Sequence, residues 1–375
     1  MKILLVHDYN PFWVGGGVET NTRYLASELQ RMGNEVALGH QDKFGTGTIS
    51  TLKTIPMANK ESVVNTFKEF DYVILIGSMS LKPLFLIGAQ ILIKQKRKFI
   101  IYFTSSSLHR PFSERIKDLT DLEVDRLDAE MFDVIASPYS VVVAISSAMR
   151  VDLLKMYSVP QSKKIYILYP GTVWPKSVYR GKLDHDKFTF ISVGRLTIDK
   201  GYMFLWEAFY HLYNELSSSD FNKKIELKVI GSGVLDRTLR FLTEEFSLSH
   251  SISFYGKVEH SEVFKHMATS HTLVHPALLE PFGNVIVEAL GLGLPVIASD
   301  FEGPKEILEN GKYGKLVPRA NTWELKETMK EIVLNEKHYV DLVNKANKSE
   351  VRDKYSISNQ ACTLIDIIQS NQLVS

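Results

Sequence analysis

This chain of 375 residues has a single cysteine and almost no net charge. Cys362 is the only cysteine, so no disulfide can form within the chain, and this fits a reducing compartment. The net charge is +1, with 44 basic and 43 acidic side chains, so there is no overall electrostatic attraction to nucleic acid. We therefore expect a cytoplasmic protein without a nucleic-acid partner.

Several motifs of catalytic and metal sites are absent as well. The chain contains no His-Glu-x-x-His, Cys-x-x-Cys or Gly-x-Ser-x-Gly pattern, which disfavours zinc peptidases, dithiol sites and serine hydrolases. The one Asp-x-Asp pattern, Asp184-His185-Asp186, precedes a predicted strand and is poorly placed to clamp a metal on a diphosphate. We therefore predict no metal site and no bound cofactor.

The chain also lacks a hydrophobic run that could span a membrane. Its most membrane-like stretch is Leu81–Phe103, where the apolar run Leu84–Ile93 is about half of the ~20 residues that a bilayer requires. Four cations follow: Lys94, Lys96, Arg97 and Lys98. We expect a buried helix leading into a strand. The alternative is that residues 81–98 rest on an anionic surface at the inner face of a membrane.

Short apolar runs alternate with amphipathic stretches through the first half. The N-terminal run, which ends at Asp8, is too short for a signal peptide and predicts a buried parallel strand. Leu25, Leu29 and Met32 indicate a helix with one buried face, and Gly33 ends it. The predicted strands are Ile3–His7, Glu35–Leu38, Tyr72–Ile76, Phe99–Phe103, Val141–Ile145 and Lys164–Leu168.

The second half repeats this architecture after a linker. Residues Pro170–Pro175 and the polar segment up to Lys187 separate the halves. The predicted strands are Phe188–Val193, Ile225–Ile230, Ile252–Tyr255, Thr272–His275, Pro295–Ser299 and Lys315–Val317. We therefore predict an α/β protein with two doubly wound, Rossmann-like domains, residues 1–172 and 173–355. Their parallel sheets would face an interdomain cleft and bind ligands at the carboxyl ends of the strands.

Glycine-rich and polar loops follow the first-half strands. Gly15-Gly16-Gly17 opens the first helix, where close backbone approach and the helix N-terminus favour an anion, although a merely flexible loop is the alternative. Thr20 stands where a dinucleotide fingerprint needs its third glycine, which disfavours a nicotinamide enzyme. His109 follows the strand ending at Phe103. It would contact a substrate hydroxyl or phosphate, unless it is incidental.

Cations and glycines follow the second-half strands. Arg195 and Lys200, after Gly194, would hold a diphosphate and neutralise a leaving group, unless they are solvated surface charges. The loops Gly231-Ser232-Gly233 and Gly256-Lys257-Val258 would bring backbone groups to a base or phosphate, and plain turns are the alternative.

The segment Glu280–Glu288 is the most informative about function. Phe282-Gly283 predicts a turn and a helix that starts near Gly283. Glu288 then lies in its second turn, about 8 Å along the axis, while Glu280 stays in the loop. Between them lies the positive end of the helix, a natural anion site. Such a site suits a ligand that is part polyol and part phosphate, as in a nucleotide sugar; the alternative is an ordinary pair of surface carboxylates.

These residues together resemble the retaining glycosyltransferases of the GT-B fold, in the large family 4 group with a Glu-x7-Glu motif. The resemblance covers nearly the whole chain in the same order. It is carried by Gly15–Glu19, Ser146, Tyr169-Pro170-Gly171, Gly194-Arg195-Leu196, Lys200-Gly201, Glu280-Pro281-Phe282-Gly283, Glu288-Ala289, Gly293–Val296, Glu306-Ile307 and Gly314–Val317.

The resemblance implies a role for each matching position. Glu288 would hold the ribose hydroxyls of the donor, and Glu280 the C3 hydroxyl of its sugar. Arg195 and Lys200 would bind the diphosphate, and His109 would reach the C6 hydroxyl. The other implied donor-binding residues are Gly16, Gly17, Gly194, Gly231, Ser232, Lys257, Val258, Phe282, Gly283, Asn284 and Val285.

The resemblance also implies an activity. A hexose would pass with retention and without a metal from a nucleoside-diphosphate sugar, a UDP-sugar in our prediction, to a hydroxyl of a glycan, lipid-linked or other acceptor. The first domain would take the acceptor, and a C-terminal helix within residues 356–375 would cross back onto it. The alternatives are a sugar-nucleotide epimerase or hydrolase of the same fold, and a non-catalytic partner protein.

Overall fold

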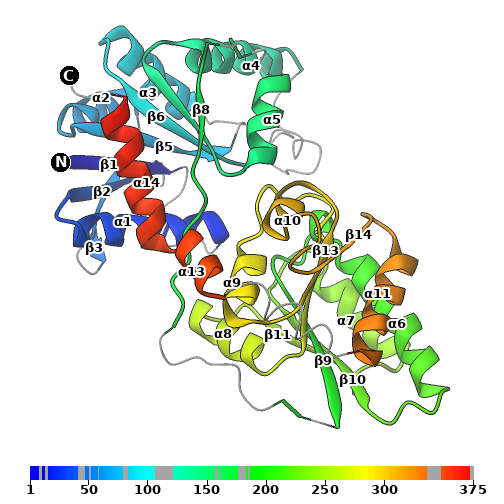
Figure 1. Ribbon diagram of the computed structural model, residues 1–375. Helices are drawn as coiled ribbons and strands as arrows, with labels where there is room; N and C mark the ends of the chain where they lie inside the picture. Colours follow the sequence, from blue (N-terminus) through cyan, green and yellow to red (C-terminus); the bar gives the residue numbers. More distant parts are fainter. Residues whose placement is uncertain are drawn as a thin grey trace. The chain divides into compact units, whose positions relative to one another are not determined.

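The computed structural model divides into two compact units, Met1–Val173 with Tyr355–Ser375, and Trp174–Lys354 (Figure 1). Each is an α/β unit built on one sheet, which confirms the predicted fold class. The structure describes residues 1–7, 11–12, 16–40, 47–49, 52–57, 59–78, 83–105, 121–156, 159–160, 162–175, 183–184, 186–335 and 348–371.

The first unit contains a sheet of order β3-β4-β2-β1-β5-β6-β7-β8. Its strands are β1 (Lys2–His7), β2 (Glu35–His40), β3 (Gly47–Ile49), β4 (Leu52–Pro56), β5 (Tyr72–Ser78), β6 (Phe99–Ser105), β7 (Ser140–Ala144) and β8 (Ile165–Ile167). Its helices are α1 (Gly17–Arg31), α2 (Lys60–Lys68), α3 (Pro83–Lys94), α4 (Asp121–Ala136), α5 (Ser147–Met156) and α14 (Ile357–Ser370).

All six strands predicted in this half are present, with ends within two residues of the prediction. They are parallel, and β1 and β7 read as continuous apolar runs because both faces of the sheet are covered. The sequence analysis missed β3 and β4, which pair antiparallel at one edge. Strand β4 is short and alternates buried Leu52 and Thr54 with exposed Lys53, so it has no apolar run.

Helix α14 returns to the first unit and packs against α1, as Figure 1 shows. Asn21 of α1 and Gln360 of α14 exchange side-chain hydrogen bonds of 2.9 and 3.0 Å, and both side chains are buried. Gly171 joins them, since its N–H donates to Gln360 and its carbonyl accepts from Asn21. This buried polar network is fully paired, so it fixes the register of the two helices.

Helix α3 is the helix expected from the apolar run before the cations. Leu86, Ala89 and Leu92 are buried. Arg97 donates to two backbone carbonyls of the segment 67–70, and Lys98 donates to the carbonyl of Asn371. Two of the four cations are therefore engaged within the first unit. Among the helices that the structure describes, none has both the length and the apolar character to cross a membrane.

The second unit contains a fully parallel sheet of order β11-β10-β9-β12-β13-β14. Its strands are β9 (Lys187–Val193), β10 (Lys224–Ile230), β11 (Ile252–Gly256), β12 (Thr272–His275), β13 (Val296–Ser299) and β14 (Lys315–Val317). Its helices are the 3-10 turn Ile198–Lys200, α6 (Tyr202–Ser217), α7 (Asp236–Glu245), α8 (His260–Ala268), α9 (Asn284–Leu292), α10 (Glu302–Ile307), α11 (Thr322–Leu334) and α13 (Lys348–Lys354).

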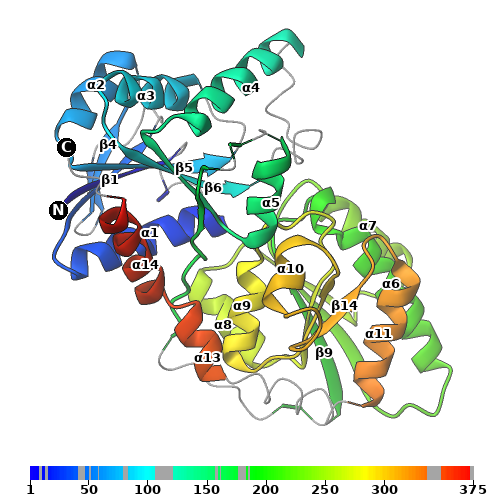
Figure 2. The ribbon, with the colours of Figure 1, turned by 45° about the horizontal axis from the view of Figure 1, so that its top comes forward.

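Each strand predicted in this half lies within one residue of its observed ends. Helices α6 and α11 pack together on one face of the sheet, and α8, α9 and α10 lie on the other (Figure 2). The core on the α6 side contains Phe188, Phe190 and Phe209, all fully buried. This two-sided cover explains why a parallel sheet with apolar strands forms, and it leaves the strand ends to carry the polar chemistry.

Candidate active site

The strand order of the second unit identifies where a ligand would bind. From β9 the chain adds β10 and β11 on one side, and then β12, β13 and β14 on the other. The order therefore reverses between β9 and β12, and doubly wound sheets bind ligands at the carboxyl ends of the strands at such a point. The loops that follow these two strands, residues 194–200 and 276–283, carry Arg195, Lys200 and Glu280.

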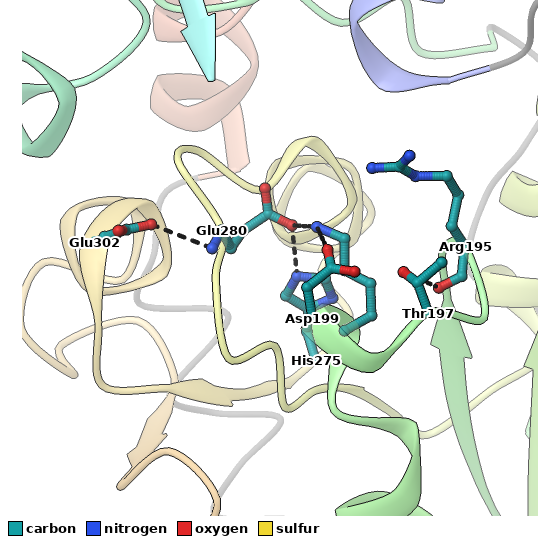
Figure 3. A network of polar contacts seen from close by, with 7 residues as sticks. Arg195, Thr197, Asp199, His275, Glu280 and Glu302 are labelled. Atoms are coloured by element: carbon teal, nitrogen blue, oxygen red, sulfur yellow. Dashed lines mark hydrogen bonds and ion pairs between the residues drawn. The ribbon is translucent and has the colours of Figure 1, made fainter. Parts of the chain in front are cut away.

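Glu280 is at the centre of a charged network at this edge (Figure 3). Lys200 Nζ lies 2.8 Å from Glu280 Oε2, and His275 Nε2 lies 2.9 Å from the same oxygen. All three side chains are largely buried: 14% of Lys200, 16% of Glu280 and 5% of His275 is exposed. Asp199 lies further away, with Oδ2 3.9 Å from Lys200 Nζ.

The network keeps Glu280 ionised. Burial alone would raise the pKa of its carboxyl, but the charge of Lys200 and the hydrogen bond from His275 outweigh burial and hold the pKa well below its usual range. An ionised carboxylate accepts hydrogen bonds and donates none. Its Oε2 is engaged, whereas Figure 3 shows Oε1 pointing away from His275, without a hydrogen bond to a described residue. Glu280 can therefore accept a hydrogen bond from a ligand hydroxyl.

Close backbone contacts hold the two loops together. The N–H groups of Leu278 and Leu279 donate to the carbonyl of Asp199, at 2.8 and 3.2 Å. Gly201 has a left-handed φ of 71°, and a Cβ there would lie 2.0 Å from the carbonyl oxygen of Pro276. Only glycine allows this approach, so the conformation that presents Lys200 to Glu280 depends on it.

Helix α9 begins where the sequence predicted, directly after Gly283. Gly283 is the N-cap and has no side chain to cap the first N–H groups, so the positive end of the helix faces the loop. Glu288 lies one turn on and is buried, and its Oε1 is 2.8 Å from His260 Nε2 at the start of α8. The surface-pair alternative fits neither carboxylate, since Glu288 is buried, Glu280 is largely buried, and each has a partner.

Arg195 is exposed, and Figure 3 shows its side chain extending on the side where the Glu280 carboxylate lies. Within the described ranges no ion pair or hydrogen bond of its guanidinium is recorded; its backbone carbonyl accepts from Thr197 N. Charge and exposure thus leave Arg195 able to bind an anion at this edge.

Hydrogen bonds also join the loops after β9, β10 and β11. Gly194 N donates to the carbonyl of Ile230, Leu196 N to that of Ser232, and Gly231 N to that of Gly256. Ser232 and Lys257 are exposed, and Val258 is half-buried. The structure therefore brings the predicted loops of the second unit to one edge of its sheet.

Two groups of predicted residues lie elsewhere. Gly16 and Gly17 belong to the first unit, where Gly16 is the N-cap of α1. His109 and Gly15 lie outside the described residues. Among the side chains that the structure describes, no group of three or more His, Cys, Asp or Glu could hold a metal ion.

Sequence reasoning missed the partners of both glutamates. His275 ends a predicted strand at its carboxyl end, five residues before Glu280, and that position was a usable signal. His260 follows Lys257-Val258 in a loop already singled out. Glu302, which accepts from the N–H of Glu280 at 3.2 Å, had no signal in the sequence.

Comparison with known proteins identifies the fold. Residues 176–349 match the family model described as "Glycosyl transferases group 1". The sucrose-phosphate synthase from Thermosynechococcus elongatus matches over 98% of both chains, with a TM-score of 0.78 and 17% identity. The chain has the GT-B fold. Anabaena Alr3699/HepE, solved in complex with UDP and glucose, matches 99% of this chain and 100% of that one, with a TM-score of 0.74 and 16% identity.

Shorter stretches of the chain also match glycosyltransferases in sequence. The "Uncharacterized glycosyltransferase MJ1059" of Methanocaldococcus jannaschii is 32% identical over 190 residues, 46% of this chain and 44% of that protein. The chain spans about half the length of the curated relatives that it matches. The GT-B fold is thus shown for the whole chain, and the match to the group 1 model for most of the second unit.

Proposed function

We propose that this GT-B protein is a retaining glycosyltransferase that transfers a hexose from a UDP-sugar to an acceptor hydroxyl. The observation that carries the proposal is the ionised, largely buried Glu280 at the strand-order reversal, beside the uncapped start of α9. A carboxylate that accepts from hydroxyls, next to an anion site, matches the sugar and diphosphate of such a donor. The UDP and glucose in the Anabaena structure support the choice of donor.

Each part of the donor has a partner in the proposal. Glu280 Oε1 accepts from a sugar hydroxyl, and Glu288, oriented by His260, accepts from the ribose. Arg195 and the N-terminus of α9 bind the diphosphate, while Lys200, which has three N–H donors, holds Glu280 and adds positive charge. The nucleotide is bordered by Gly194, Gly231, Ser232, Lys257 and Val258. The sugar is bordered by Phe282, Asn284 and Val285.

The proposed step needs no metal and no protein nucleophile. The bond from the sugar C1 to the diphosphate oxygen breaks and a bond from C1 to the acceptor oxygen forms on the same face. The acceptor proton goes to the departing diphosphate, whose charge Arg195, Lys200 and the helix end stabilise. The acceptor is a glycan, a lipid-linked sugar or another hydroxyl compound. Contact of residues 81–98 with a membrane surface stays a hypothesis.

Donor turnover tests the proposal. Nucleotide sugars are incubated with the protein, with and without a mixture of acceptor glycosides, and the products are followed by NMR. Transfer with retained anomeric configuration is expected. Epimerised donor as the main product would favour the epimerase alternative, and free sugar would favour the hydrolase alternative. Donor binding without turnover would favour the non-catalytic partner protein.

Chelation tests the metal-independent part. Because cations of the chain supply the charge stabilisation, EDTA is expected to leave the transfer rate within about twofold of its value, far from the ~10²-fold loss that follows removal of a charge-stabilising group. Assays with and without EDTA, after dialysis, measure this. Loss of all activity that returns with Mg²⁺ or Mn²⁺ would contradict it.

Removing either member of the Glu288–His260 pair is expected to weaken donor binding. Glu288→Ala deletes the ribose acceptor, and His260→Ala leaves the buried carboxylate without its 2.8 Å partner. Losing a hydrogen bond to a charged group costs about 1.5–3 kcal/mol, so the donor Kd should rise about 10–10²-fold in each variant. Calorimetric titration with UDP measures this. His266→Ala, on the same helix α8, is the control and should keep the wild-type Kd; unchanged Kd in both pair variants would refute the ribose assignment.

A further inference from the structure

Glu302 has an unusual backbone conformation for its residue type. It begins α10, separated from the end of β13 by Asp300 and Phe301, and its φ of 46° lies in the left-handed region. A residue with a Cβ is disfavoured there, because the Cβ crowds the following carbonyl oxygen. Such strain persists only where the surrounding structure imposes it, and it often occurs at functional sites. The contacts of Glu302 therefore need an explanation.

The carboxylate of Glu302 contacts the main chain of Glu280. Glu302 Oε2 accepts from Glu280 N at 3.2 Å, and the next residue, Gly303, donates its N–H to the carbonyl of Glu280, also at 3.2 Å. Figure 3 shows the Glu302 carboxylate directed at the Glu280 backbone. Both polar groups of the Glu280 main chain are thus held by the first two residues of α10.

The loop Asp300–Phe301 and the start of α10, which carries Glu302, lie directly against the segment after Glu280. A Cβ on Gly303 would lie 2.1 Å from the carbonyl oxygen of Phe282, so the backbones touch. Arg319 ties the same loop to the preceding segment, because its Cζ lies 3.5 Å from the ring centroid of Phe301 and its Nη1 donates to the carbonyl of Leu278 at 3.0 Å. Of these contacts, the hydrogen bond of Glu302 is the one in which a side chain binds the main chain of Glu280.

We propose that Glu302 is a positioning residue for Glu280. The strained backbone aims its carboxylate at Glu280 N, and this fixes the main chain from which the Glu280 carboxylate reaches the donor sugar. Lys200 and His275 hold the carboxylate of Glu280 through its Oε2. Its Oε1 is therefore held in one direction. The inference rests on the proposed function, in which Oε1 meets a sugar hydroxyl. A displacement of about 1 Å at such a contact costs up to ~10²-fold in rate.

Three variants separate positioning from a general structural role. Glu302→Gly removes the side chain and accepts the left-handed φ without strain, so its Tm should equal or exceed that of the wild type. Its kcat/KM for donor should fall about 10–10²-fold. Glu302→Gln keeps an oxygen that accepts from Glu280 N and should restore activity to within about threefold. The matched control is Glu309→Gly, a glutamate with the same φ of 46° beyond α10, which should keep wild-type activity.

Hydrogen exchange gives a readout that does not depend on turnover. In Glu302→Gly the amide of Glu280 should exchange at least ~10-fold faster than in the wild type, whereas Glu309→Gly should leave it unchanged. Wild-type kcat/KM or wild-type exchange in Glu302→Gly would overturn the inference, and so would a fall in Tm that Gln does not restore. If the wild type turns over no nucleotide sugar, the proposed function fails; faster exchange at Glu280 would then still support the positioning contact.

Discussion

Replacing Glu280 with glutamine is expected to lower the rate of sugar transfer by about 10²–10³-fold while the protein stays folded. The amide matches the carboxylate in shape, and its oxygen, placed where Oε2 lies, can still accept the bonds from both Lys200 and His275. The loss of stability should therefore stay near 1–3 kcal/mol. What disappears is the negative charge that orients Lys200 and the second acceptor oxygen that the sugar needs.

The control for this variant is Glu226→Gln. Glu226 also pairs with a lysine in the second unit, since its Oε1 lies 2.7 Å from Lys187 Nζ, but β10 carries it near the amino ends of the strands. The same chemical change there should leave transfer at the wild-type rate. Initial rates at saturating donor and acceptor, with circular dichroism to verify folding, provide the measurement. Equal rates for Glu280→Gln and the wild type would show that the Glu280 carboxylate has no role in sugar transfer.

Replacing Lys200 with alanine is the second large effect, a loss of at least ~10²-fold in transfer. The change removes the cation 2.8 Å from Glu280 and leaves a largely buried carboxylate with His275 as its remaining partner in the network. Breaking a buried ion pair from one side costs about 3–5 kcal/mol, so stability should fall as well. Stopped assays at a temperature well below the Tm of the variant separate the two effects.

Two further variants show whether the charge at position 200 matters. Lys200→Arg keeps the cation and should recover more activity than Lys200→Ala, although the guanidinium differs in shape from the ammonium group. Lys187→Ala removes a lysine from the start of β9 and should have wild-type activity. If Lys200→Ala and Lys187→Ala transfer sugar equally fast, Lys200 has no part in the chemistry.

Local patterns predicted the two sheets because strands such as β1, β7 and β9 are buried on both faces and therefore appear as apolar runs. Strand β4, next to the edge strand β3, was missed because it alternates buried and exposed residues, and its five residues alternate too briefly to stand out. The start of α9 was predicted correctly because the Phe-Gly turn precedes a continuous apolar run. Local chemistry and tertiary structure agree at these elements.

The sequence predicted the residues of the site better than their pairing. Lys200 and Glu280 lie 80 positions apart and meet because β9 and β12 are neighbours in the sheet, which no local pattern specifies. His260 reaches Glu288 for a similar reason, through the packing of α8 on α9. The role of Glu302 depends on a backbone angle, and a glutamate at that position gives no hint of it. Spatial order and backbone strain are properties of the folded chain.

A thermal-shift titration with nucleotide sugars tests the central claim most directly, that this edge of the second unit binds such a donor. A ligand at 100 times its Kd stabilises the native state by about 2.7 kcal/mol, which raises the Tm by several degrees. We predict such a shift for at least one UDP-sugar with the wild type and with Glu226→Gln, and a shift reduced by about half or more with Glu288→Ala, as the expected 10–10²-fold rise in Kd requires. A panel of nucleotide sugars that leaves the wild-type Tm unchanged, or a shift that Glu288→Ala keeps in full, would contradict the account.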